Sequence, residues 1–235
     1  MLRPRRYPEM IGKALVLEAD PFITMVDDDE PWAEGLFMLI VVGFVVGLAR
    51  FLGGLLLTLS LPPSAAMVEA LAQGWEQVGS AVVAPALTAA GGELVRQGYA
   101  AAALVGGFGG GWARLLVLIT TPMGLVVQWL IFALIGHGVA RALGGRGTLD
   151  KTLGATALMV APQSLRLLSV IPFVSVSTLL LLVWSLLIGY RALAVAHDLA
   201  WQEAMWAALM PVVAIVVLVA AGVGIWGISI LWSGI

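Results

Sequence analysis

The sequence predicts an all-α, polytopic membrane protein with five transmembrane helices, a cytoplasmic N-terminus, an outer C-terminus and interfacial amphipathic helices. Three observations predict this class. Of the 235 residues, 61% are hydrophobic and only 11% are charged, and the mean hydropathy is +1.03. Soluble domains average about 45–50% apolar and roughly 25% charged residues. The composition therefore excludes a water-soluble globule.

The apolar stretches are long enough to cross a hydrocarbon core of about 30 Å, which takes about 20 helical residues. The first stretch contains one charge, Arg50, and the second is uncharged up to Arg141. The third stretch is too long for one span and divides at Ile171-Pro172-Phe173, which predicts a tight helical hairpin. We expect spans at 36–61, 115–141, 153–171, 174–192 and 206–230.

Residues 1–35 are predicted to form a cytoplasmic segment that precedes the membrane domain at 36–235. An apolar face at helical spacing and nearby basic residues indicate an amphipathic helix on the leaflet surface. The acidic run Asp27-Asp28-Asp29-Glu30 lacks the spacing of a calcium loop and is read as a solvated charge run. The apolar face comprises Tyr7, Met10, Ile11, Ala14 and Leu15.

An outer loop at about 62–114 is expected between the first two spans. Four apolar residues share one helical face opposite Glu and Gln residues, which predicts a second interfacial helix there. The glycine pair at 91–92 and the glycine-rich run at 106–111 are read as flexible loop or as sites of close helix approach, because no phosphate-binding motif fits them. The apolar face is Met67, Leu71, Trp75 and Val78.

The distribution of Lys and Arg predicts the orientation, since positively charged flanks stay in the cytoplasm. With the N-terminus inside, the outer flanks contain only Arg96 and Arg114. The cytoplasmic flanks then contain eight basic residues: Arg3, Arg5, Arg6, Lys13, Arg141, Arg146, Lys151 and Arg191.

Two arginines, Arg50 and Arg166, fall inside the predicted spans and away from their cytoplasmic ends, where a charge is costly and indicates function by default. The predicted spans contain no Asp or Glu. The partner would therefore be a lipid phosphate, a carboxylate of another protein, or one of the loop residues Glu69, Glu76 and Glu93. The alternative is snorkelling of the side chains to the interface. We expect Arg50 about 16 Å and Arg166 about 10 Å below the outer ends of their spans.

Two further features are candidate contact or ligand sites. Gly43 and Gly47 form a GxxxG pattern that allows close helix packing, either within the chain or against a partner. His137 is the only histidine in a predicted span and is a weak candidate ligand for haem or a pigment. It lies 60 residues from His197, so the sequence predicts no histidine-rich metal site, and we expect no metal and no cofactor.

Catalytic motifs are absent: the sequence contains no HExxH, GxSxG or P-loop pattern and no paired carboxylates within the predicted spans. The net charge of −2 also argues against binding to nucleic acid. An odd number of spans does not divide into inverted repeats, which makes a transporter or channel the weakest alternative. We therefore expect a protein that is not an enzyme.

Three motifs stand out in the second half of the chain: Gly144-Gly145-Arg146-Gly147-Thr148-Leu149, the stretch 155–163 that ends in Pro162 and Gln163, and Val183-Trp184-Ser185-Leu186-Leu187-Ile188. In these motifs the chain resembles the Yip family, the Ypt/Rab-interacting five-span membrane proteins. The Asp20-Pro21-Phe22 segment is similar to prokaryotic members. Eukaryotic members bind small GTPases, but their Asp-Leu-Tyr-Gly-Pro signature is absent near the first span, so binding to a small GTPase is not expected here.

The resemblance implies a non-catalytic scaffold or organiser of the cell membrane, acting through contacts with lipids, with other membrane proteins or with itself. An alternative is an accessory subunit of a larger bacterial energy-converting or photosynthetic complex. The residues expected to make these contacts are Arg50, Arg166, Gly43, Gly47, Pro162 and Gln163.

Overall fold

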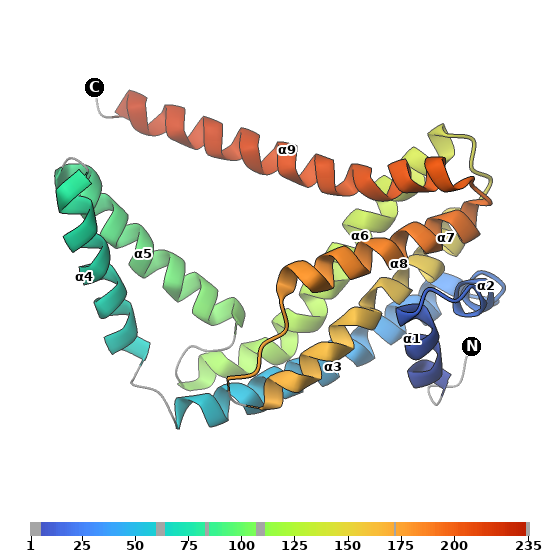
Figure 1. The fold of residues 1–235 in the computed structure, drawn as a ribbon, viewed down its shortest axis with the longest axis horizontal. Helices are drawn as coiled ribbons and strands as arrows, with labels where there is room; N and C mark the ends of the chain where they lie inside the picture. The colour runs from blue at the N-terminus through green and yellow to red at the C-terminus, as the bar shows by residue number, and fades with distance from the viewer. Residues whose placement is uncertain (1–5, 60–63, 83–84, 107–110, 172, 234–235) are drawn as a thin grey trace. The chain divides into compact units, whose positions relative to one another are not determined.

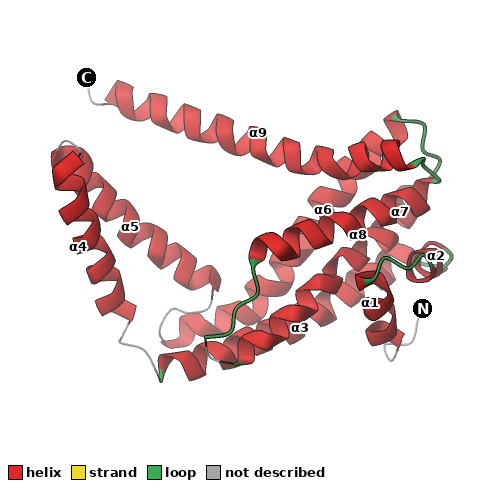
Figure 2. Cartoon of the chain, in the orientation of Figure 1, coloured by secondary structure: helices red, strands yellow, loops and turns green. Residues whose placement is uncertain are grey.

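The computed structural model describes residues 6–59, 64–82, 85–106, 111–171 and 173–233. Within these ranges the chain forms helices and loops and no strand, as Figures 1 and 2 show. The elements are α1 (Tyr7–Leu15), α2 (Asp20–Val26), α3 (Pro31–Thr58), α4 (Ser64–Val82), α5 (Pro85–Gly106), the 3₁₀ helix η2 (Gly111–Leu116), α6 (Val117–Ala142), α7 (Leu149–Ala157), the 3₁₀ helix η3 (Leu158–Val170), α8 (Thr178–His197) and α9 (Trp201–Ser233).

Five helical segments of the described chain are long and apolar enough to cross a membrane, in agreement with the five predicted spans. They are Pro31–Leu57, Arg114–Ala142, Leu149–Val170, Thr178–His197 and Trp201–Gly222. The third combines α7 and η3. Because the observed helices extend beyond the predicted boundaries, three acidic residues that the sequence placed outside the spans fall within them: Glu34, Asp150 and Glu203.

The connection between the third and fourth spans is longer than predicted. Helix α8 begins at Thr178 and not at residue 174, and residues 173–177 are not helical. Phe173 has a φ of 67°. This left-handed conformation is uncommon for a bulky residue and interrupts a right-handed helix at this point. Pro172, where the turn was predicted, lies outside the described residues.

The predicted outer loop is largely helical. Helices α4 and α5 occupy most of it, so of the two readings given for the glycine pair, flexible loop or close helix approach, the structure supports close helix approach within a second helix. Gly91 and Gly92 lie inside α5. A Cβ atom on Gly91 would collide with the indole of Trp75, so this glycine permits close helix packing. Residues 107–110 of the second glycine run lie outside the described residues.

The chain divides into two compact units. The first comprises residues 1–40, 125–162 and 178–235, and the second comprises residues 41–124 and 163–177. The first therefore holds α1, α2, α7, α8 and α9 with parts of α3, α6 and η3. The second holds α4, α5, η2 and the remaining parts of α3, α6 and η3.

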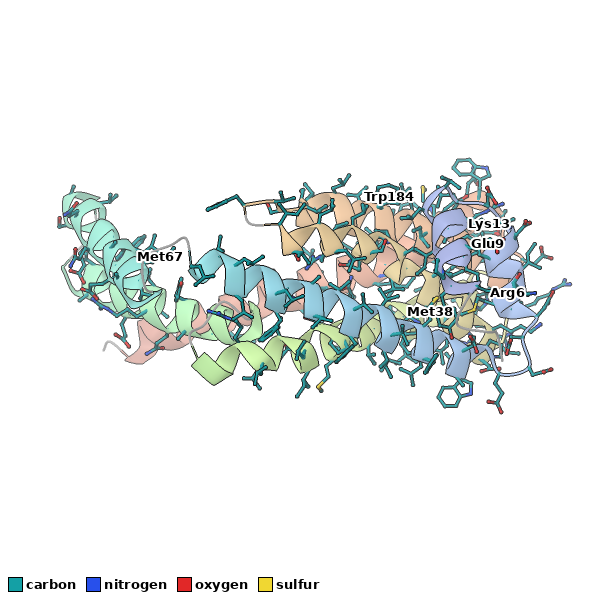
Figure 3. The ribbon with its side chains drawn as sticks, turned by 90° about the horizontal axis from the view of Figure 1, so that it is seen from below. Arg6, Glu9, Lys13, Met38, Met67 and Trp184 are labelled. Carbon is teal, nitrogen blue, oxygen red and sulfur yellow. The ribbon has the colours of Figure 1, made fainter. Side chains whose placement is uncertain are left out.

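In the first unit, the N-terminal helices use their apolar faces within the protein. Tyr7, Met10 and Ala14 of α1 and Phe22 and Met25 of α2 are buried, and both helices contact α8. The predicted amphipathic pattern is present, but its apolar face packs on protein. Glu9 and Lys13 lie on the polar side of α1 and Arg6 directly precedes the helix; Figure 3 labels all three.

Two indole hydrogen bonds fix the elements of the first unit. Trp184 of α8 donates from Nε1 to the carbonyl of Leu15 at 2.9 Å, which gives a partner to a carbonyl that the end of α1 leaves free. Trp129 of α6 donates to the carbonyl of Leu153 and contacts Thr156 Oγ1, each at 3.1 Å. These bonds attach α1 to α8 and α6 to α7.

Candidate functional site

One face of α3 in the second unit carries both the glycine pattern and an arginine. Gly43, Gly47 and Arg50 are separated by four and three residues, so they lie on the same side of the helix. A Cβ atom on Gly43 would lie 2.6 Å from Pro122 Cα, and one on Gly47 would lie 3.1 Å from the carbonyl oxygen of Val117. The glycine pattern therefore packs against α6 within this chain.

This packing places Arg50 beside a polar group of α6. Arg50 Nη1 donates to Thr121 Oγ1 at 3.2 Å, and Thr121 is buried. Helix α6 contains Pro122 inside the second span. The glycine face and the arginine, which the sequence predicted separately, are thus parts of one contact.

A third glycine brings the other arginine to the same region. A Cβ atom on Gly53 of α3 would collide with the carbonyl oxygen of Ser169 and would lie 3.4 Å from Val170 Cα. Because η3 approaches α3 at this glycine, Arg166 of η3 and Arg50 of α3 belong to the two segments that meet here. Arg166 Nε is buried without a hydrogen-bond partner, as is Ser169 Oγ.

Two arginines that converge in this way form a candidate anion site, which we call the Arg50/Arg166 site. Guanidinium groups bind phosphate and carboxylate through charge-assisted hydrogen bonds. Arg50 precedes the end of α3 by eight residues, or about 12 Å. Arg166 precedes the end of η3 by four residues, or about 8 Å. Both positions are closer to the helix ends than predicted.

The acidic partners that the sequence offered to these arginines are engaged elsewhere. Glu69, Glu76 and Glu93 all pair with Arg96, at nitrogen–oxygen distances of 3.6, 3.6 and 4.0 Å. The hypothesis that one of these carboxylates folds into the membrane to meet Arg50 is therefore wrong for this conformation. These glutamates lie on α4 and α5, and Arg96 of α5 is the arginine close enough to pair with them.

The two remaining predicted contact residues, Pro162 and Gln163, are buried in η3. Helix η3 has 13 residues and contains Pro162. A 3₁₀ run longer than three or four residues is uncommon, and the ring of a proline prevents regular α-helical hydrogen bonding. Their burial assigns both residues to the helix packing of the third span.

His137 has a different environment from the one predicted. Its Nδ1 lies 3.0 Å from Thr152 Oγ1 and 3.3 Å from His197 Nε2, and Thr152 Oγ1 lies 2.8 Å from His197 Nε2. The sequence separation of 60 residues made this pair appear unconnected, but α6, α7 and the end of α8 bring the two imidazoles together. No group of three or more His, Cys, Asp or Glu suited to a metal occurs among the described residues.

The loop before α7 covers this histidine cluster. A Cβ atom on Gly145 would lie 2.8 Å from His197 Nδ1, and one on Gly147 would collide with the carbonyl oxygen of Ala196. The backbone N–H of Arg146 donates to the carbonyl of His197 at 3.2 Å. The glycine-rich motif at 144–147 is therefore required by the close approach of this loop to the end of α8.

A buried carboxylate completes the polar contacts of the first unit. Tyr7 of α1 donates its hydroxyl to Glu34 Oε1 at 2.6 Å, and both residues are buried. Burial of the phenol, followed by the hydrogen bond to Glu34, raises the pKa of Tyr7 above its ordinary value. This pair was not predictable from the sequence, because the spacing of Tyr7 assigned it to an apolar helical face.

Taken together, five apolar helical segments, buried polar contacts between them and close glycine packing define a multi-pass, all-helical membrane protein. The family model of the Yip1 domain matches residues 15–224. The chain belongs to the Yip1 family, as the motifs of its second half predicted. No curated protein and no solved structure matches the chain.

Proposed function

We propose that this chain is a non-catalytic organiser of the cell membrane that acts through protein and lipid contacts, and that the Arg50/Arg166 site holds the phosphate of a membrane lipid. The observation that carries the proposal is the convergence of two arginines in one packed region of the spans. Because like charges repel, two adjacent guanidinium groups are stabilised by an anion placed between or beside them.

The position of the site favours a lipid phosphate as that anion. Arg50 and Arg166 lie about 12 and 8 Å from the ends of their helices, a depth that a lipid phosphate reaches where the bilayer thins locally around a charged side chain. Arg166 retains a buried Nε without a hydrogen-bond partner. A phosphate supplies several acceptor oxygens to such donors, and Arg binds it in a bidentate manner.

The experiment compares the phospholipid that stays bound to the purified chain. We would extract wild type, Arg166→Leu and the control Arg146→Leu in mild detergent, wash each with lipid-free detergent, and measure bound phosphate per chain and native mass. Arg146 is an exposed loop arginine. We expect wild type and Arg146→Leu to retain phospholipid and Arg166→Leu to lose it.

Equal retention of phospholipid by Arg166→Leu and wild type would overturn the lipid assignment. The native masses of the same samples test whether the site instead contacts another protein. Loss of a co-purifying polypeptide from Arg166→Leu, with lipid unchanged, would reassign the site to a protein carboxylate and favour the accessory-subunit alternative.

A further inference from the structure

The longest connection outside the five spans forms a helical hairpin, which we call the α4–α5 hairpin (residues 64–106). Only residues 83–84 separate α4 from α5, so the helices are neighbours, and they make many contacts with each other. Trp75 of α4 donates from Nε1 to the carbonyl of Thr88 at 3.1 Å. Ala72 and Gly79 of α4 are buried against this interface.

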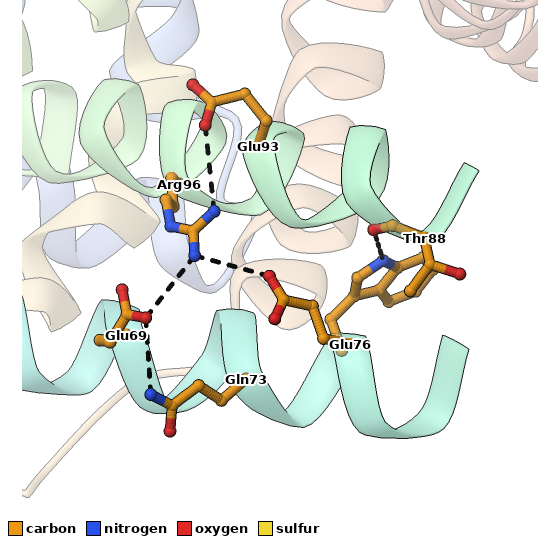
Figure 4. A network of polar contacts seen from close by, with 7 residues as sticks. Glu69, Gln73, Glu76, Thr88, Glu93 and Arg96 are labelled. Atoms are coloured by element: carbon orange, nitrogen blue, oxygen red, sulfur yellow. Dashed lines mark hydrogen bonds and ion pairs between the residues drawn. The ribbon is translucent and has the colours of Figure 1, made fainter. Parts of the chain in front are cut away.

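The charged groups of the hairpin pair with one another. Arg96 of α5 meets Glu69 and Glu76 of α4 and Glu93 of its own helix, as Figure 4 shows. Gln73 adds a hydrogen bond from Nε2 to Glu69 Oε1 at 3.5 Å. This network links the two helices and fixes which face of α4 meets α5.

The side of α4 next to this interface is apolar and exposed, and Trp75 at its edge also contacts α5. Met67, Leu71, Trp75 and Val78 retain 36%, 54%, 41% and 67% of their accessible surface. Their spacing of four, four and three residues places them in one stripe along the helix. The polar residues Gln73 and Gln77 are exposed on another side. A contiguous group of exposed apolar side chains is typical of a surface that binds a partner or a membrane.

The connections to the spans restrict what can cover this stripe. Five residues separate Thr58 at the end of α3 from Ser64, and four separate Gly106 from Gly111 at the start of η2. At about 3.3–3.6 Å per residue, neither connection can exceed about 20 Å. Because α3 and α6 are consecutive spans, both connections leave the same bilayer face. The hairpin is thus held close to that face at both ends.

We propose that the α4–α5 hairpin lies in the membrane–water interface, with the stripe Met67, Leu71, Trp75 and Val78 inserted among lipids. Tryptophan with apolar neighbours is typical of interfacial helices. The hairpin contains three Glu and one Arg, a net charge of −2, so the attraction comes from apolar burial and needs no anionic lipid. This inference is independent of the Arg50/Arg166 site.

The test uses single cysteines, because the natural chain contains none. Leu71→Cys and Val78→Cys place an environment-sensitive fluorophore on the stripe, and the matched control Gln77→Cys places it on the exposed polar side of the same helix. Each full-length variant is reconstituted into vesicles of phosphatidylcholine alone. Quenchers are a nitroxide attached to the lipid near the headgroup and iodide in the water.

We expect labels at positions 71 and 78 to show blue-shifted emission, strong quenching by the lipid nitroxide and weak quenching by iodide. Their depth should be about 5–10 Å into the headgroup and acyl boundary, as for other interfacial helices. The label at position 77 should show the reverse pattern. All three positions are exposed in the chain, so the substitutions leave the fold intact.

Two outcomes would overturn the inference. Blue-shifted labels protected from both quenchers would show that the stripe is covered by protein, either a second copy or another subunit. Quenching by iodide at all three positions would show that the stripe faces water.

Discussion

At the residue scale, the glycines of α3 show which sequence patterns were sufficient to predict close helix packing. The GxxxG pattern of Gly43 and Gly47 predicted close helix packing, and the structure identifies α6 as the neighbour. Gly53 belongs to no motif, yet it is the residue that lets η3 approach and bring Arg166 towards Arg50. A single glycine carries no local signal, because the backbone that requires it lies more than 100 residues away.

Replacing Gly43 by Ala tests this packing. The added methyl would lie 2.6 Å from Pro122 Cα, and because the neighbour is backbone it cannot move aside. We expect a loss of about 1–3 kcal/mol, as for other overpacked cores, measured as the thermal unfolding midpoint in detergent. The matched control is Gly124→Ala on α6, where a Cβ atom meets nothing within 4 Å. The control should be neutral or stabilising by up to about 1 kcal/mol, and equal midpoints for both variants would contradict the packing.

Replacing Tyr7 by Phe tests the attachment of α1 to α3. The change removes the 2.6 Å hydrogen bond to buried Glu34, and we expect a cost of about 1–3 kcal/mol at neutral pH. The pKa of Tyr7 is raised by burial and by Glu34. The stabilisation is therefore complete below the ordinary phenol pKa of about 10 and is lost as the pH rises through the higher pKa of the folded state.

Unfolding midpoints of wild type and Tyr7→Phe, measured from neutral to strongly alkaline pH, check both statements. Their difference should stay constant up to about pH 10 and shrink above it. A difference that is already lost at pH 8 would show that the phenol is exposed and ordinary. A difference of zero throughout would show that the bond contributes nothing to folding.

At the element scale, the five spans were predictable, whereas helix α5 and the packing partners of the spans were not. Apolar length located all five spans, but the third is divided between α7 and the 3₁₀ helix η3, a distinction that apolar periodicity does not resolve. The glycine-rich motif at 144–147 identified the family, while its physical role becomes visible only with His197 beneath it. The histidine cluster joins three elements far apart in sequence, so no spacing rule could have revealed it.

Thr152 is the residue that links the two imidazoles of this cluster, and Thr152→Val tests it. The hydroxyl contacts His137 Nδ1 at 3.0 Å and His197 Nε2 at 2.8 Å, and donates to the carbonyl of Thr148 at 2.8 Å. Valine keeps the shape but leaves buried polar atoms without this partner, a cost of about 1–3 kcal/mol. The unfolding midpoint should fall accordingly, whereas Thr24→Val, at an exposed threonine of α2, should change it little. A midpoint unaffected by Thr152→Val would mean that the cluster contributes no stability.

At the scale of the whole molecule, charge and hydropathy predicted the class and the number of spans. Every span has to be apolar to match the bilayer. The number of spans is therefore encoded by many residues, and it is predicted correctly even where the ends of individual helices are not. The outer connection was less predictable. Its helix α5 contains two adjacent glycines and many alanines, and its order depends on Trp75 and Arg96 contacts that become visible only once α4 and α5 are paired.

The charge asymmetry of the chain predicts its orientation in the membrane, and this prediction can be tested directly. Eight Lys and Arg flank the predicted cytoplasmic ends against two at the predicted outer ends, so the positive-inside rule predicts a cytoplasmic N-terminus and an outer α5. Gly12 of α1 and Gly98 of α5 are exposed, and a Cβ atom at either meets nothing within 4 Å. In a chain without natural cysteines, Gly12→Cys and Gly98→Cys therefore report on each side. A membrane-impermeant maleimide added to intact cells should label Gly98→Cys at once and Gly12→Cys only after permeabilisation, and the opposite pattern would invert the topology.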